Sequence, residues 1–166
     1  MHRFALTNSA SINNKIVITM EVKIKKLNSK AVIPTYAMPG DAGMDLTPVT
    51  LHYDDKLGFI YGTGLAIEIP KGYLGFIFPR SSNRKTNAYM CNHVGIIDSG
   101  YRGEIFITFK NRDANEIIAP YDVKEGKAIA QLVIMPYPTI ELVEVEELSE
   151  TERGEGGHGH TDNKNG

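Results

Sequence analysis

The chain has 166 residues, of which 42% are apolar and 23% charged, which is typical of one soluble globular domain with its own core. Its net charge of −2 provides no overall field that would attract nucleic acid or an anionic membrane, and no run approaches the roughly 20 apolar residues of a membrane span. The single cysteine, Cys91, excludes a disulfide framework and a cysteine-built zinc site, and it fits a reducing, cytoplasmic compartment.

Residues 1–19 precede the first regular pattern of the sequence. They hold two early basic groups, His2 and Arg3, but no sustained apolar core before a small-residue cleavage site, so we do not expect a signal peptide. We interpret them as an N-terminal extension of unknown role. A β domain is expected over 20–148, followed by a flexible glycine-rich C-terminal arm over 149–166.

Short strands are predicted along most of the chain, because alternating or apolar runs end repeatedly at turn-forming residues. The five clearest runs cover residues 21–25, 65–69, 74–78, 104–110 and 128–135. Such closely spaced strands indicate an all-β fold, either a sandwich or a jelly-roll-like barrel.

Helix signals are weak, because 16 glycines and 8 prolines interrupt the chain. One short helix is expected around 82–89, with Ser81 or Ser82 as its cap. The chain turns acidic from Glu141 and glycine-dense after Arg153, which predicts a tail that stays mobile until it docks.

Five segments carry residues suited to chemistry, and each alone has two interpretations. They are 42–46, 79–82, 92–103, 126–132 and 153–161. Arg80-Ser81-Ser82 offers either an anion cradle or a capped helix with a surface arginine.

Three further side chains are equally ambiguous. Asp98 could orient a water molecule or cap a turn, and Asp45 could help hold a hydrated cation or satisfy buried backbone donors. Gln131 could contact a ligand or lie on the solvent face of its strand. The glycine-rich arm by itself is most often a linker, and its histidines form no recognisable metal array.

Taken together, in this order and at these spacings, the five segments resemble the five motifs of trimeric dUTPases. The resemblance runs from about Met20 to Thr161. Its most specific parts are Asp98 three residues before Tyr101-Arg102-Gly103, and the run from Arg153 to Gly157. It implies a jelly-roll-like distorted barrel and a homotrimer in which each active site takes parts from three subunits.

The resemblance also implies the reaction, which is hydrolysis of dUTP to dUMP and pyrophosphate. Such an enzyme keeps uracil out of DNA and supplies dUMP for thymidylate synthesis. Asp98 would position and deprotonate a water molecule for in-line attack on the α-phosphate. Mg²⁺ would be held mainly by the triphosphate oxygens and by water, and Asp45 would contact it only through water.

Substrate contacts follow from the same resemblance. The phosphates would be bound by Arg80, Ser81 and Ser82 with support from Gln131, and Arg153 would reach the γ-phosphate. Tyr101 would pack on the deoxyribose and leave no room for a 2′-hydroxyl. The remaining expected contacts, which serve the base and the closing arm, are Asn92, Gly95, Ile96, Ile97, Phe106, Gly157 and His158.

The arm departs from the family pattern at two positions. His158 stands where the family usually has a phenylalanine that stacks over uracil, and Asp162 stands where many members have glycine. An imidazole can stack too, but it covers less area and protonates near neutral pH. These departures bear on closure of the arm more than on the reaction.

Three alternatives remain open. A dCTP deaminase shares this fold, but it would need a catalytic glutamate in the base pocket and a different tail. A dUTPase-like regulatory module that binds a protein partner is the second. A purely structural jelly-roll protein is the third, and it leaves Arg80, Asp98 and Tyr101 as coincidences.

Overall fold

The computed structural model describes residues 19–156, and within them the chain is almost entirely β, as expected. Its only helices there are two short 3-10 helices, and no helix in this range has the length and apolar character that a membrane span needs. The strands are β1 (Lys23–Lys26), β2 (Met44–Leu46), β3 (Thr50–Asp54), β4 (Gly58–Gly62), β5 (Leu65–Glu68), β6 (Tyr73–Pro79), β7 (Ala88–Met90), β8 (Gly95–Ile97), β9 (Phe106–Asn111) and β10 (Ala130–Pro136). The 3-10 helices are η1 (Ser81–Lys85) and η2 (Val123–Glu125).

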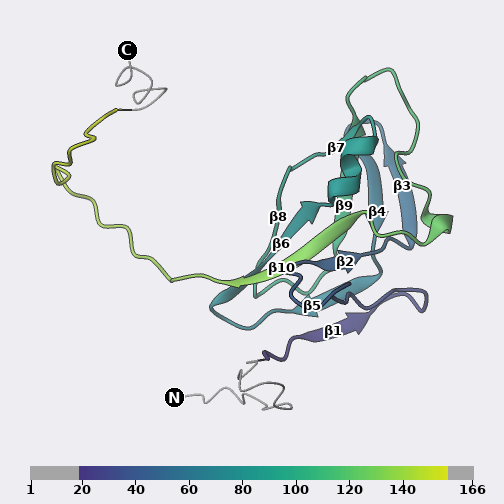
Figure 1. Ribbon diagram of the computed structural model, residues 1–166, viewed down its shortest axis with the longest axis horizontal. Coiled ribbons are helices and arrows are strands. Elements are labelled where there is room, and N and C mark those ends of the chain that lie inside the picture. The colour runs from purple at the N-terminus through teal and green to yellow at the C-terminus, as the bar shows by residue number, and fades with distance from the viewer. Residues whose placement is uncertain (1–18, 157–166) are drawn as a thin grey trace.

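The strands form three antiparallel sheets (Figure 1). One pairs β1 with β5, the second has the order β2-β10-β6-β8, and the third has the order β3-β4-β9-β7. Among the described strands these sheets do not close into a barrel. The architecture is therefore jelly-roll-like in its strands but open at the sheet edges.

The core lies between the sheets and is built by period-two alternation. In β9, Ile107 and Phe109 are buried, whereas the first residue, Phe106, is half exposed. Tyr61 of β4 and Leu132 of β10 are also fully enclosed. Burying side chains of this size contributes about 1.5–3 kcal/mol each to folding, so these residues set the frame that carries the site.

The helix expected at 82–89 is wrong in type and extent. A 3-10 helix covers Ser81–Lys85, Thr86 is extended, and Ala88–Met90 form a strand that pairs with β9. Neither expected serine caps the helix, because the N-cap is Arg80 and no side chain there accepts a capping bond. Sheet pairing of β7 overrides the local helix preference.

The chain leaves the fold after β10. Residues 137–156 form no strand or helix and nearly all are exposed, and Figure 1 shows this segment running away from the sheets. It carries exposed apolar side chains, including Ile140, Leu142 and Leu148, which are 72%, 89% and 86% exposed. Apolar side chains left outside a core are typical of a segment that docks elsewhere.

Candidate active site

Arg80, directly after β6, is held by two acceptors from distant parts of the chain. Its Nε lies 2.9 Å from Oδ1 of Asp45 on β2, and its Nη1 donates to the carbonyl of Ala128 at 3.2 Å. β10 lies between β2 and β6, so the ion pair spans the central strand of its sheet. The structure thus brings together two of the predicted phosphate-side residues.

Gln131 lies on the same strand β10, opposite Asp45 in the register. Its Nε2 donates to the carbonyl of Pro79 at 3.3 Å, so the amide supports the strand end from which Arg80 projects. Gly43 lies beside it, and a Cβ at that position would lie 2.5 Å from Oε1 of Gln131, so a larger residue would displace this amide from Pro79. The glutamine is half-buried rather than on an open solvent face.

Arg80 and Asp45 border a cavity of about 480 Å³, the phosphate-side cavity, whereas Gln131 is not among its lining residues. Asp45, Arg80 and Ser82 line it, whereas Ser81 lies exposed on η1. The other lining residues are Val32, Ile33, Thr35, Thr47, Tyr121, Asp122, Glu125, Gly126, Lys127, Ala128 and Ile129. Its two cations, Arg80 and Lys127, lie among three carboxylates. Arg80 is paired with Asp45 and Lys127 with Glu125, so a phosphate chain would compete with these ion pairs for the two cations.

A second cavity, of about 310 Å³, lies beside β8 and β9 and is the base-side cavity. Three predicted base-side residues, Asn92, Gly95 and Phe106, line it together. Cys91 also lines this cavity, and its thiol contacts the carbonyl of Leu57 at 3.6 Å. Burial raises the pKa of the Cys91 thiol above its ordinary value, which disfavours the reactive thiolate.

The two isoleucines of β8 differ in their surroundings. Ile97 packs against the core, while Ile96 is 62% exposed. Backbone pairing with β6 fixes this short strand, and Gly95 is its one residue among those that line the cavity.

The turn after β8 carries Asp98 and Tyr101, and both side chains are exposed. The Tyr101 N–H donates to the Asp98 carbonyl at 3.0 Å, and its hydroxyl donates to the Glu104 carbonyl at 2.8 Å. Its ring lies against Gly103, where a Cβ would collide with the tyrosine hydroxyl. The turn is thus pre-formed by its own hydrogen bonds.

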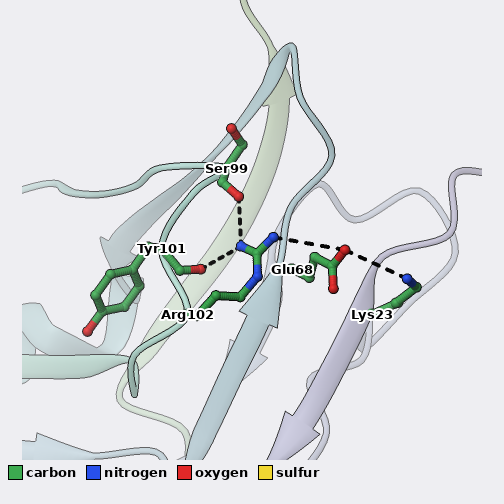
Figure 2. A network of polar contacts seen from close by, with 5 residues as sticks. All are labelled: Lys23, Glu68, Ser99, Tyr101 and Arg102. Carbon is green, nitrogen blue, oxygen red and sulfur yellow. Dashed lines mark hydrogen bonds and ion pairs between the residues drawn. The ribbon is translucent and has the colours of Figure 1, made fainter. Parts of the chain in front are cut away.

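Arg102 ties this turn to the β1–β5 sheet (Figure 2). Its Nη1 donates to the carbonyls of Ser99 and Tyr101 at 2.7 and 2.8 Å, and its Nη2 lies 3.9 Å from a carboxylate oxygen of Glu68. Lys23 shares that carboxylate at 3.7 Å. In Figure 2 the tyrosine ring points away from the guanidinium, so Arg102 orders the backbone and leaves the Tyr101 ring outside its contacts.

The phosphate-side residues and Asp98 lie at separate places on one sheet. Arg80 follows β6, which pairs with β8, but it lies roughly 16 Å along the strand from Gly75, the partner of Ile97. Asp45 is on β2 and Asp98 follows β8, the two outer strands of the four-stranded sheet. Three strand spacings separate these edges by about 14 Å, and side chains cannot close that gap. Within one copy of the chain, the structure brings the phosphate-side residues together with each other, but not with Asp98.

Residues of the arm are only partly described. Arg153 is exposed, and its Nε donates to the carbonyl of Gly156 at 2.8 Å within a local turn. The predicted contacts Gly157 and His158 lie outside the described residues.

A metal ion needs several protein ligands or a bound substrate that supplies the rest. Within 19–156, no group of three or more His, Cys, Asp or Glu side chains is placed to hold one. Asp45 lies on the wall of the phosphate-side cavity, and its carboxylate is the kind of hard oxygen donor that Mg²⁺ prefers. The residues fit a magnesium ion that takes most of its ligands from a bound phosphate chain and water.

Sequence reasoning missed several residues that shape the two cavities. Tyr121 lines the phosphate-side cavity, and Lys56 and Lys110 line the base-side cavity. No local pattern marks them, because Tyr121 and Lys56 lie in loops and only Lys110 belongs to a strand, and all three reach their cavities through the tertiary fold. Gly43 could have been found, since it stands inside the segment that carries Asp45.

Comparison with known proteins gives one consistent result. Residues 29–162 match the family model described as dUTPase. The chain is 39% identical over 142 residues to a deoxyuridine 5'-triphosphate nucleotidohydrolase of Nocardia farcinica, covering 83% of each chain. It is 44% identical over 146 residues to the protein of that name from Nautilia profundicola, covering 86% of this chain and 99% of the relative.

Solved structures show the same similarity. A Staphylococcus bacteriophage 80alpha dUTPase variant with dUpNHpp superposes with a TM-score of 0.66 at 30% identity, covering 86% of this chain and 99% of the other. A dUTPase variant from phage phi11 of S. aureus, whose description mentions a structural Mg(II) ion, gives 0.60 at 29% identity and covers 78% and 99%.

Proposed function

Because the chain belongs to the dUTPase family and is a dUTP diphosphatase, we propose that Asp98 activates the water molecule that cleaves dUTP. The observation that carries this proposal is the position of Asp98. Its carboxylate is exposed directly after β8, the strand whose Gly95 lines the base-side cavity, on a turn held by Tyr101 and Arg102. A uracil nucleotide in that cavity would direct its phosphates toward this turn.

In the reaction, the Asp98 carboxylate accepts a proton from water as the water oxygen attacks the α-phosphorus. The bond from that phosphorus to the bridging oxygen of pyrophosphate breaks, and dUMP and pyrophosphate leave. General-base assistance of this kind typically contributes ~10²–10⁴ in rate. Arg80 and Ser82 would neutralise and orient the phosphates on the other wall of the cleft.

The active site would be shared between copies of the chain in a homotrimer. Within one copy, Arg80 and Asp98 lie at opposite ends of β6, because Asp98 follows Ile97, the partner of Gly75, whereas Arg80 follows Pro79, so a neighbour would supply the phosphate side. The exposed apolar arm over 137–156 suits docking on a further copy, which would bring Arg153 to the γ-phosphate.

Magnesium would be held by the triphosphate and by water, with Asp45 contacting it through water. The ion supplies charge neutralisation of the phosphates. Base choice would rest on Asn92 and the β8 backbone, because uracil presents an N3–H donor and an O4 acceptor where cytosine reverses both. Mismatched buried polar groups can give ~10⁴ discrimination.

We further propose that the protein works in the cytoplasm, where removal of dUTP keeps uracil out of DNA and dUMP feeds thymidylate synthesis. A dCTP deaminase is the alternative that shares the fold. The base-side cavity has no glutamate among its lining residues, which favours hydrolysis over deamination.

The experiment measures pyrophosphate release from dUTP, dCTP, dTTP and UTP with magnesium, beside ammonia release from dCTP. We expect pyrophosphate from dUTP alone. Asp98→Asn should lower kcat by at least about a hundredfold and leave the affinity for dUpNHpp unchanged. Ammonia from dCTP, or an Asp98→Asn variant with the wild-type kcat, would overturn the proposal.

A further inference from the structure

The turn that carries the phosphate-side residues lacks stability of its own. η1 is a five-residue 3-10 helix with no buried residue and no side-chain cap. Helices of this type have poor hydrogen-bond geometry and rarely persist unaided. Arg80 has its own contacts with Asp45 and Ala128, so further contacts from outside the turn must hold the rest of it, including Ser82.

Asn83, in the middle of η1, provides the attachment. Its Nδ2 donates to the carbonyl of Ala88 on β7 at 3.3 Å, and its Oδ1 accepts from the Tyr121 hydroxyl at 2.6 Å. Thr86 Oγ1 lies 2.8 Å from the Asn83 carbonyl and 3.1 Å from Oδ1, and its single proton can serve only one of them. Among the described residues, the short bond from Tyr121 is the one side-chain hydrogen bond that joins Asn83 to a segment beyond the η1–β7 connection.

Tyr121 is itself fixed to the buried core. The hydroxyl of Tyr61, whose side chain is fully enclosed, donates to the Tyr121 carbonyl at 3.0 Å and accepts from its N–H at 3.1 Å. The Tyr121 ring packs on Phe109 with centroids 5.1 Å apart. Backbone and ring are both immobilised, so the tyrosine hydroxyl has a defined position from which to hold Asn83.

We propose that Tyr121 is a positioning residue for phosphate binding, whose hydroxyl holds the Arg80–Ser82 turn in its binding geometry through Asn83. The inference rests on the proposed function for the identity of the ligand. Tyr121 lines the phosphate-side cavity and is not among the described residues that line the base-side cavity. Its loss should therefore weaken binding of the phosphates and leave binding of the base unchanged.

The test uses the full-length protein with Tyr121→Phe, which keeps the ring on Phe109 and removes only the hydroxyl. Affinities for dUpNHpp and for deoxyuridine are measured by calorimetry, together with kcat and KM for dUTP. We expect dUpNHpp to bind about three- to tenfold more weakly, the change that loss of one neutral hydrogen bond produces, and KM to rise in parallel. Deoxyuridine affinity should not change.

Tyr53→Phe is the matched control, because Tyr53 borders neither cavity and keeps its ring contact with Phe59. Asn83→Ala should give the same pattern as Tyr121→Phe. The double variant should lose no more affinity for dUpNHpp than Asn83→Ala alone, since both changes remove one shared link.

Two results would overturn the inference. One is a Tyr121→Phe variant whose loss of affinity for dUpNHpp is no greater than its loss of affinity for deoxyuridine. A variant that had lost structure in general would show this result together with a lower Tm. The other is a double variant whose loss equals the product of the two single losses. Failure of the proposed function is separate, because it would appear as absent pyrophosphate release in the unmodified protein.

Discussion

The guanidinium of Arg80 and the carboxylate of Asp45 meet across β10, with 2.9 Å between Nε and Oδ1. The pair joins two segments that are 35 positions apart in the chain (80 − 45 = 35). Both side chains are about one-third exposed, so the pair contributes roughly 1 kcal/mol or less to stability. Under the proposed function, its importance would lie in orienting Arg80 toward a phosphate.

Asp45→Asn should therefore affect substrate binding more than folding. The variant keeps the size of the side chain and loses the charge that orients Arg80. We expect KM for dUTP to rise about tenfold, because hydrogen bonds to charged groups contribute ~1.5–3 kcal/mol, and Tm to fall by only a few degrees. Steady-state kinetics and thermal unfolding test this. A KM within twofold of wild type would show that Asp45 does not orient Arg80.

Complementation between variants tests whether the active site is shared. Asp98→Asn and Arg80→Ala should each be nearly inactive alone. Co-assembled in equal amounts, they should regain about a quarter of wild-type activity, since each of two contributing positions has a one-half chance of carrying the intact residue. Absence of any gain over the separate variants would mean that one copy holds a complete site.

Gly103→Ala should weaken exclusion of ribonucleotides. The added methyl group would displace the Tyr101 ring, which lies directly against Gly103. We expect the ratio of kcat/KM for dUTP over UTP to fall by about tenfold. Gly100→Ala is the control in the same turn, because a Cβ there meets no atom within 4 Å. Equal ratios in both variants would argue against a role of Tyr101 in sugar choice.

Stability at alkaline pH should report on Tyr61. Burial raises the pKa of Tyr61 from 10.0 to about 12, so above pH 10 the unfolded chain loses this proton before the folded chain does. The stabilisation is complete below pH 10 and is lost as pH rises toward 12, with a loss of roughly 2–3 kcal/mol from this group. Chemical denaturation at pH 8 to 11.5 measures it.

The comparison with Tyr61→Phe isolates that group from other titrating side chains. The variant should be less stable at pH 8, because the backbone carbonyl and N–H of Tyr121 would both lose their hydrogen bonds to the Tyr61 hydroxyl. Its stability should then decline less steeply with pH. If the free energy of unfolding fell equally with pH in the two proteins, Tyr61 would not contribute to the loss of stability at alkaline pH.

The sequence alone predicted the strands that alternate strongly, and it offered a turn as one of two interpretations of Asp98. β5, β6, β9 and β10 lie within two residues of their expected bounds at every end. The Tyr101–Asp98 and Arg102–Ser99 bonds join residues three apart, so local spacing carries their geometry. Recognition of the family followed from the same short segments.

Tertiary structure decided the rest. Ala88–Met90 became a strand because β9 supplied its partner, and Arg80, Asp45 and Gln131 met only because β10 pairs with both β2 and β6. The Tyr121 link to Asn83 spans 38 positions and leaves no periodic trace in the sequence. Local spacing encodes turns and strand faces, whereas contacts between distant strands depend on register and packing that exist only in the folded chain.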